Sequence, residues 1–316
     1  MDIAKVSEIS RAVIAEVERA VVGKRDLLEN IMAATLAGGN VLLEDFPGLG
    51  KTLIARSFAA ALGLEFKRIQ FTPDLLPGDI TGGYIFNRTK NKFELRQGPV
   101  FTNILLADEI NRASPKTQSA LLEAMQEGQV TIEGESLALP EPFVVLATQN
   151  PIEYEGTFPL PEAQLDRFMI KLAVGYPSAE EEKEILQRRR QRKQDELSLR
   201  VIAKPAQFTG MRAALEEVHV DPDLEGYIST LVHATRVDRR VAVGASPRAS
   251  LAFLKMARAF AAISGRNYIL PDDIKRFALP VLSHRLLLLP EYWMSQQVNG
   301  EVIRDVLSQT PVPVIQ

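Results

Sequence analysis

The chain contains 316 residues, of which 46% are hydrophobic and 24% charged, which is typical of a globular protein and excludes wholesale disorder and fibrous repeats. The length suggests about two domains. No cysteine is present, which excludes disulfides, thiolate metal ligands and a cysteine nucleophile, and the net charge of −3 gives no global basic field that would attract nucleic acid.

The amino-terminal part of the chain alternates predicted helices with predicted strands. Hydrophobic spacing and turn signals predict helices over 3–21, 24–37, 52–62 and 114–128. Short apolar runs predict strands at 41–43, 66–71, 104–107, 143–147 and 169–174. Two hairpins are predicted between these elements, one inside 72–102 and the other within 129–142. Strands that alternate with helices favour a five-stranded parallel sheet in an α/β domain.

The strand pattern disappears after residue 177, and only helices are predicted beyond it. Ser178 and Glu181 form a capping box that opens a helix reaching about residue 194. Further helices are predicted to start at Asp221, at Ser246 and near Pro271. The sequence therefore predicts an α/β domain over 1–196 and a smaller all-helical domain over 197–316.

The segment from Glu44 to Thr52 predicts a phosphate-binding loop, because it follows an apolar strand, precedes a helix and contains Gly-x-Gly-Lys-Thr. Lys51 would reach the β- and γ-phosphates, and the Thr52 hydroxyl would hold Mg²⁺. Asp45 stands where the usual pattern has glycine, and its carboxylate is unfavourable near triphosphate unless it points away. The alternative is an ordinary glycine turn before a helix.

Two acids, Asp108 and Glu109, follow the predicted strand 104–107. A buried parallel strand delivers its carboxyl end to the ligand crevice. Asp108 would orient the Mg²⁺ shell, and Glu109 would polarise the attacking water. The alternative is a strand-to-loop transition that happens to be acidic.

Three more polar residues fit a triphosphate site. Asn150 follows another strand and would hydrogen-bond the γ-phosphate or the water; the alternative is a turn with Pro151. No Asn-Lys-x-Asp sequence for reading guanine follows that strand, which favours ATP. Arg167 would extend to a neighbouring subunit, or it pairs locally with Asp166 or Glu162. Arg248 opposes the dipole of its own helix, which favours an anion nearby, unless it is simply solvated.

Other features of the sequence carry less information. The segment 21–24, which includes Val22 and Gly23, joins two helices and is a weak candidate for holding adenine. The basic run 188–193 lies at the end of a helix that opens with acids, which favours a solvated face over a nucleic-acid patch. The basic hairpin tip 87–92 is either a soluble turn or a partner-binding loop. The three histidines show no ligand spacing, so no transition-metal site is predicted.

In its motifs, the sequence resembles the MoxR family of AAA+ ATPases. The resemblance covers nearly the whole chain and rests on residues 47–52, 74–82, 98–101, 105–113, 147–151, 165–168 and 244–248. It implies a P-loop core followed by a helical lid, with ATP and Mg²⁺ as cofactors. It also implies that 72–102 is the helix-two insert and that Asp45 is tolerated.

The resemblance assigns roles to particular residues. Lys51 and Thr52 would belong to Walker A, and Asp108 and Glu109 to Walker B. The same resemblance makes Asn150 sensor one, Arg167 the arginine finger and Arg248 sensor two, with Arg112 as a second candidate contact in trans. The residues expected to bind nucleotide or Mg²⁺ are Val22, Gly23, Pro47, Gly48, Leu49, Gly50, Lys51, Thr52, Leu53, Asp108 and Arg248.

The resemblance further implies a homo-oligomer, typically a hexameric ring, that remodels client proteins with a von Willebrand factor A domain partner. Such proteins are thought to act in the maturation of metal- or cofactor-containing enzymes. Three alternatives stay open: a nucleic-acid motor, the ATPase subunit of a magnesium-chelatase-like complex, and a nucleotide-gated scaffold with negligible turnover. With no apolar leader and no long uncharged stretch, we expect a cytoplasmic protein without a membrane span.

Overall fold

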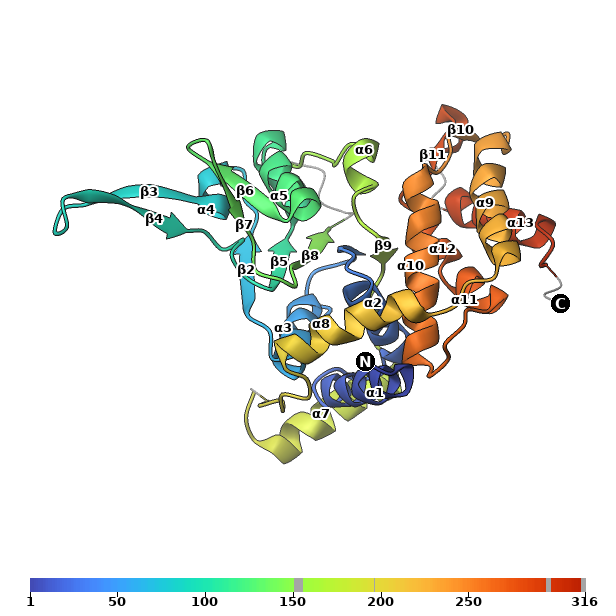
Figure 1. Cartoon of the computed structure of the whole chain (residues 1–316), viewed down its shortest axis with the longest axis horizontal. Helices are drawn as coiled ribbons and strands as arrows, with labels where there is room; N and C mark the ends of the chain where they lie inside the picture. Colours follow the sequence, from blue (N-terminus) through green and yellow to red (C-terminus); the bar gives the residue numbers. More distant parts are fainter. Residues whose placement is uncertain (151–155, 196, 294–296, 314–316) are drawn as a thin grey trace.

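The computed structural model describes residues 1–150, 156–195, 197–293 and 297–313. Figure 1 shows an α/β body from which one hairpin projects, with a group of carboxyl-terminal helices beside it. In the described part of the chain, no helix is both long enough and apolar enough to cross a membrane.

A five-stranded parallel sheet forms the centre of the α/β body, as the sequence predicts. Its strands lie in the order β2-β5-β8-β1-β9. Their bounds are β1 (Val41–Glu44), β2 (Phe66–Gln70), β5 (Ile104–Asp108), β8 (Val144–Gln149) and β9 (Ile170–Leu172). Because every strand runs the same way, all carboxyl ends lie along one edge of the sheet.

Both faces of the sheet are buried, which is why its strands read as continuous apolar runs. Leu43 and Leu106 belong to one hydrophobic cluster, whereas their neighbours Leu42 and Leu105 belong to the cluster on the opposite face. The first face is covered by α1 (Ile3–Glu18), α2 (Arg25–Leu36) and α3 (Lys51–Ala61), and the second by α5 (Pro115–Glu127).

Local signals set the ends of these helices. The Ser114 hydroxyl accepts a hydrogen bond from the Thr117 N–H at the start of α5, and Gly128 ends that helix with a φ of 60°. Two short helical segments, η1 (Ile110–Arg112) and α6 (Glu162–Leu165), lie in loops that follow the carboxyl ends of strands.

Two antiparallel hairpins interrupt the α/β pattern at the predicted places. The first comprises β3 (Gly82–Asn87) and β4 (Lys92–Gln97), follows the short helix α4 (Pro77–Thr81), and projects from the body in Figure 1. The second comprises β6 (Gln129–Ile132) and β7 (Glu135–Ala138). The Tyr84 hydroxyl donates to Glu135 at 2.6 Å and thereby joins the two hairpins.

Helices dominate the chain beyond residue 177. They are α7 (Ala179–Arg192), α8 (Pro205–Ala214), η2 (Leu215–Glu217), α9 (Pro222–Val237), α10 (Pro247–Ile263), α11 (Pro271–Arg276), α12 (Ala278–Leu282), η3 (Pro290–Tyr292) and α13 (Val298–Gln309). The capping box at Ser178 and the helix starts at Asp221 and Ser246 are confirmed.

The prediction that this region is entirely helical is wrong in one detail. Strands β10 (Val241–Val243) and β11 (Leu287–Leu288) form a small antiparallel sheet. The two strands are far apart in the chain and very short, so neither carries the alternating pattern by which a strand is recognised.

The helical region is packed firmly against the α/β body. The Ile202 N–H donates to the Ala61 carbonyl at 2.8 Å, and the Ser7 hydroxyl of α1 donates to the Ile263 carbonyl of α10 at 2.7 Å. Helices α8 and α10 contribute to the same hydrophobic cluster as α1 and α2. A domain boundary at 196 stays a prediction.

Candidate active site

The carboxyl ends of β1, β5 and β8 meet at one point of the sheet edge. Glu44 lies opposite Gln149 in the register of β1 and β8, and Ala107 of β5 lies opposite Ala147 of β8. The Asp45 N–H donates to the Gln149 carbonyl at 3.1 Å. The start of the glycine loop, the acidic pair and Asn150 therefore lie on adjacent strands.

The glycine loop forms an open cradle at the start of α3. Gly48 and Gly50 have φ angles of 84° and 83°, which side-chain-bearing residues rarely adopt. A Cβ atom placed on either glycine would meet nothing within 4 Å. Because Gly50 is the N-cap of α3, the N–H groups of the first turn face this space and favour an anion. This geometry fits a phosphate group.

Asp45 does not direct its carboxylate at the cradle. Its Oδ2 accepts a hydrogen bond from the Gly175 N–H at 2.5 Å, and its Oδ1 accepts one from the Phe46 N–H at 2.8 Å. The side chain is buried. The carboxylate thus ties the loop to the segment after β9, which answers the electrostatic objection to an acid at this position.

Lys51 is buried at the base of the cradle. Its Nζ donates to the Asp45 carbonyl at 2.6 Å. Burial lowers the pKa of Lys51, and the negative charges of Asp108, Asp45 and Glu109 oppose that shift. A phosphate at the cradle would add a further negative charge beside this ammonium group.

Asp108 lies at the end of β5 and is held by two neighbours. Its Oδ1 accepts from the Thr148 hydroxyl at 2.6 Å, and its Oδ2 accepts from Arg68 of β2 at 2.7 Å. The same Thr148 oxygen accepts from the Glu109 N–H at 2.8 Å. A single buried hydroxyl therefore fixes both acids relative to β8.

Glu109 adopts a left-handed conformation with a φ of 56°, which is uncommon for a residue with a side chain. Its Oε2 accepts from the Gln70 amide at 2.7 Å and from Arg112 at 3.1 Å. Strained backbone of this kind concentrates at functional sites. Arg112, a candidate contact in trans, here pairs with the acid of its own chain.

Sequence reasoning missed Arg68, Gln70 and Thr148 as parts of the site. A signal for the first two exists, because they lie two residues apart at the carboxyl end of β2 and therefore share a face of the strand. Thr148 belongs to the Thr-Gln-Asn segment that suggested Asn150. Only the pairing of β5 with β8 shows that its hydroxyl reaches the acids.

Asn150 is buried directly beyond the end of β8. Its predicted neighbour in a turn, Pro151, lies outside the described residues. Val22 is also buried, and Gly23 lines a hollow of about 440 Å³ together with Leu172 and Ala173. By contrast, Leu53 is 46% exposed and lines a different hollow next to α3.

Gly23 is favoured by its left-handed backbone and lies against the side chain of Glu181. A Cβ atom on Gly23 would lie 1.8 Å from the Glu181 Oε1, and its φ of 71° is left-handed. Glu181 is the capping-box acid of α7: its Oε2 accepts from the Ser178 N–H at 2.7 Å, and its own N–H donates to the Ser178 hydroxyl at 3.2 Å. The loop between α1 and α2 thus packs on the start of α7.

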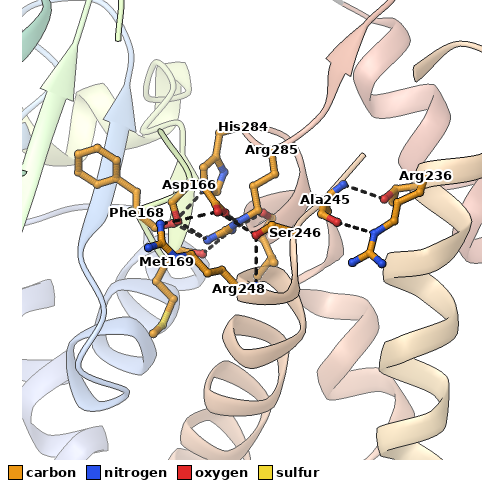
Figure 2. A network of polar contacts seen from close by, with 11 residues as sticks. Asp166, Phe168, Met169, Arg236, Ala245, Ser246, Arg248, His284 and Arg285 are labelled. Carbon is orange, nitrogen blue, oxygen red and sulfur yellow. Dashed lines mark hydrogen bonds and ion pairs between the residues drawn. The ribbon is translucent and has the colours of Figure 1, made fainter. Parts of the chain in front are cut away.

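Asp166, the residue before Arg167, lies close to Arg248 (Figure 2). The Asp166 carboxylate accepts from Arg285 at 2.7 Å and from the Ser246 hydroxyl at 2.8 Å, and it lies 3.9 Å from Arg248. The anion beside Arg248 is therefore a carboxylate of the α/β body. Arg167 is half-buried, and its Nε has no hydrogen-bond partner among the described residues.

Two family models and several known proteins match this chain. Residues 40–170 match the ATPase family associated with various cellular activities (AAA), and residues 233–306 match the AAA lid domain. Chaperone MoxR1 of Mycobacterium tuberculosis is 44% identical, over 97% of this chain and 82% of that protein. The chain belongs to the MoxR family of AAA+ ATPases.

Two further proteins match this chain along nearly its whole length. YeaC of Bacillus subtilis, described as uncharacterized, is 49% identical over 95% of this chain and 94% of that protein. A crystal structure described as a candidate ATPase of Cytophaga hutchinsonii superposes with a TM-score of 0.92 at 40% identity, covering 98% of this chain and 96% of that one. Magnesium-chelatase ChlI of Nicotiana tabacum is more distant, at 30% identity over 58% of this chain.

The oxygen donors Thr52 and Asp108 of this MoxR chain fit Mg²⁺. Thr52 and Asp108 offer oxygen atoms, the ligands that Mg²⁺ prefers when it keeps several waters. Among the described residues, no group of three or more His, Cys, Asp or Glu side chains is arranged to hold a metal ion. Phosphate oxygens would have to complete such a shell.

Proposed function

We propose that this MoxR protein binds ATP at the edge of its sheet and hydrolyses it to ADP and phosphate. The observation that carries the proposal is the meeting of three strand ends, which brings the cradle of Lys51, the acids Asp108 and Glu109, and Asn150 to one place. Membership of an ATPase family supports it.

Each residue would have a distinct task. Lys51 and the N–H groups at the start of α3 bind the phosphates, and Thr52 and Asp108 hold Mg²⁺, partly through water. Bound Mg²⁺ supplies positive charge that neutralises the phosphate oxygens. Glu109 accepts a proton from the attacking water, which Asn150 orients. Val22 and Gly23, in the loop between α1 and α2, would contact adenine.

The second part of the proposal is that two neighbouring subunits of a ring contribute residues to each nucleotide site. Arg167 would reach the γ-phosphate of a neighbouring subunit, while Arg248 would contact the nucleotide of its own chain. A planar guanidinium that is always charged suits this task. A hexamer is the expected assembly.

The proposed biological role is chaperone-like remodelling. It rests on the similarity to the protein named Chaperone MoxR1 and on the family resemblance, which adds a von Willebrand factor A domain partner and clients that contain metals or cofactors. The magnesium-chelatase alternative is less favoured, because those relatives match just over half of the chain.

Glu109→Gln tests the hydrolytic part directly. The amide keeps the shape of the side chain but cannot accept the proton, so ATP affinity should be retained and phosphate release should fall by at least about 100-fold. Binding is measured with a fluorescent ATP analogue and turnover by phosphate release. Glu123→Gln, on the exposed side of α5, is the matched control and should behave as wild type.

Two outcomes would contradict this assignment. Normal turnover of Glu109→Gln would show that another group activates the water. No phosphate release from the wild-type protein, despite tight ATP binding, would favour the nucleotide-gated scaffold instead.

A further inference from the structure

Arg285 is a buried cation of the helical region that contacts the segment carrying Arg167. Its side chain is 3% exposed and follows α12. The Nε donates to the Asp166 carboxylate at 2.7 Å. The two terminal nitrogens donate to backbone carbonyls, at 2.7 Å to Phe168 and at 3.1 Å to Met169. Asp166, Phe168 and Met169, which Figure 2 shows around Arg285, flank Arg167 in the sequence.

A second lid residue supports the same segment. The Nε2 of His284 lies 3.0 Å from the Phe168 carbonyl, and the ring is buried. The Nη1 of Arg285 also donates to the carbonyl of Val281 in α12, and this hydrogen bond helps to fix the Arg285 side chain. The turn 166–169 is therefore held from the lid by Arg285 and His284, in addition to the hydrogen bond that the Met169 N–H donates to the Asn40 carbonyl of the α/β body at 2.8 Å.

The same network reaches the start of α10. Ser246, the N-cap of that helix, donates its hydroxyl to Asp166 at 2.8 Å, and Arg248 follows two residues later. The backbone of Ala245 is held to α9 through Arg236 at 2.9 Å. Asp166 is thus the one carboxylate in Figure 2 that contacts both the Arg285 fork and the helix of Arg248.

We propose that Arg285 is a positioning residue for the arginine finger: by holding Asp166 and the carbonyls of Phe168 and Met169, it fixes the direction in which Arg167 is presented to the neighbouring subunit. The proposal rests on the shared site described under Proposed function. A buried fork that satisfies several carbonyls at once restrains a turn more than any single hydrogen bond does. An Arg285 variant keeps every residue that is proposed to contact the nucleotide bound to the same subunit.

The test uses mixed rings of the full-length chain. Arg285→Met should lower turnover by about 100-fold, as expected when a catalytic group is displaced by roughly 1 Å. The variant still has an intact glycine loop but cannot present its finger. Mixed with Lys51→Ala, which has the finger but not the loop, it should recover activity, because about one interface in four then combines a working loop with a working finger.

A second mixture separates positioning from damage to the subunit's own site. Arg285→Met mixed with Arg167→Ala should stay inactive, since neither subunit presents a finger. Recovery in this mixture would show that Arg285→Met still offers its finger and is defective in its own site, which would overturn the proposal. No recovery in either mixture, with mixed rings confirmed by two affinity tags, would overturn it as well.

The reference mixture is Arg167→Ala with Lys51→Ala. If this pair does not recover activity in confirmed mixed rings, the shared site itself fails. If it does recover and Arg285→Met with Lys51→Ala does not, only the role of Arg285 fails.

Two further variants guard against misfolding. Arg285→Lys keeps the buried charge but loses the planar fork, so it should show the same mixing pattern with a smaller loss of turnover. Arg266→Met removes another lid arginine, one whose fork contacts Asp273 at 2.7 Å and not the 166–169 turn. It should leave turnover unchanged in folded rings, and a finger-type mixing pattern for it would contradict the assignment.

Discussion

At the scale of single residues, the Thr148 hydroxyl links the two acids of the candidate site through hydrogen bonds. It is fully buried, donates to the Asp108 carboxylate at 2.6 Å and accepts from the Glu109 N–H at 2.8 Å. Both acids are positioned through this one atom, so a small change there should affect the site more than its size suggests.

Thr148→Val tests this dependence. Valine fills the same space but leaves the Glu109 N–H without its partner, which should cost about 1–3 kcal/mol of stability. We expect turnover to fall by about 10-fold or more, since oriented catalytic groups tolerate little displacement. Thr148→Ser, which retains the hydroxyl, is the control. Equal phosphate release by the valine and serine variants would show that the hydroxyl is dispensable.

His284 gives a prediction about pH. Burial holds the pKa of its imidazole well below 6.5, and the positive charges of Arg285 and Lys171 lower it further, while the Phe168 carbonyl acts in the opposite direction. The unfolded chain therefore binds a proton at a higher pH than the folded chain does. Stability contributed by the neutral ring is present above the unfolded pKa and is lost as the pH falls below it.

We expect the free energy of unfolding to decrease between about pH 7 and about pH 5.5, the window in which an unfolded histidine becomes charged. His284→Gln keeps a donor for the Phe168 carbonyl but does not titrate, so its stability should change less over this window. Urea unfolding at several pH values measures this. An identical pH dependence in both proteins would contradict the role given to His284.

Recognisable motifs in the sequence led to the candidate site residues Lys51, Thr52, Asp108, Glu109 and Asn150, whose roles stay predictions. The sequence did not predict their partners, because these depend on which strands are neighbours. Arg68 and Gln70 reach the acids only because β2 pairs with β5. Arg285 lies in none of the motifs, and its contact with Asp166 joins residues 119 positions apart in the sequence.

At the scale of elements, the hairpin β3–β4 has no fully buried residue, although Tyr84 and Leu95 pack against the core. Phe86 and Phe93 face each other across the hairpin with ring centroids 5.3 Å apart, yet they are 49% and 67% exposed. Apolar rings left in solvent contribute little to folding and are characteristic of contact surfaces.

Replacing both of these phenylalanines by serine should therefore change the free energy of unfolding by less than about 1 kcal/mol. Basal phosphate release should stay at the wild-type level. Phe71→Ala, at a fully buried ring, is the contrasting change and should cost about 3–5 kcal/mol. Urea unfolding of the three proteins measures the difference, and a large loss in the double variant would place the hairpin in the core.

Most elements were predictable because their signals are local. Apolar runs bounded by turns gave the five sheet strands, and capping residues gave the starts of α5, α7, α9 and α10. The pair β10–β11 was not predictable, because each strand is too short to show a pattern and is defined by its partner. The order of the sheet strands likewise depends on long-range packing.

At the scale of the whole molecule, the α/β body and the lid share one hydrophobic cluster, which includes Leu43 of β1 and Phe253 of α10. The two parts are thus joined by apolar packing in addition to the polar network at Asp166. A cavity of about 610 Å³ also lies between them, lined by Arg212 and Lys255 among others. None of the predicted site residues lines that cavity.

A structure of the protein with Mg²⁺ and a non-hydrolysable ATP analogue would show whether the glycine cradle binds the nucleotide. We expect the triphosphate in the cradle of Gly48 and Gly50, with the Lys51 Nζ moved from the Asp45 carbonyl to phosphate oxygens. A triphosphate bound in the cavity lined by Arg212, with Lys51 still on Asp45, would contradict this expectation.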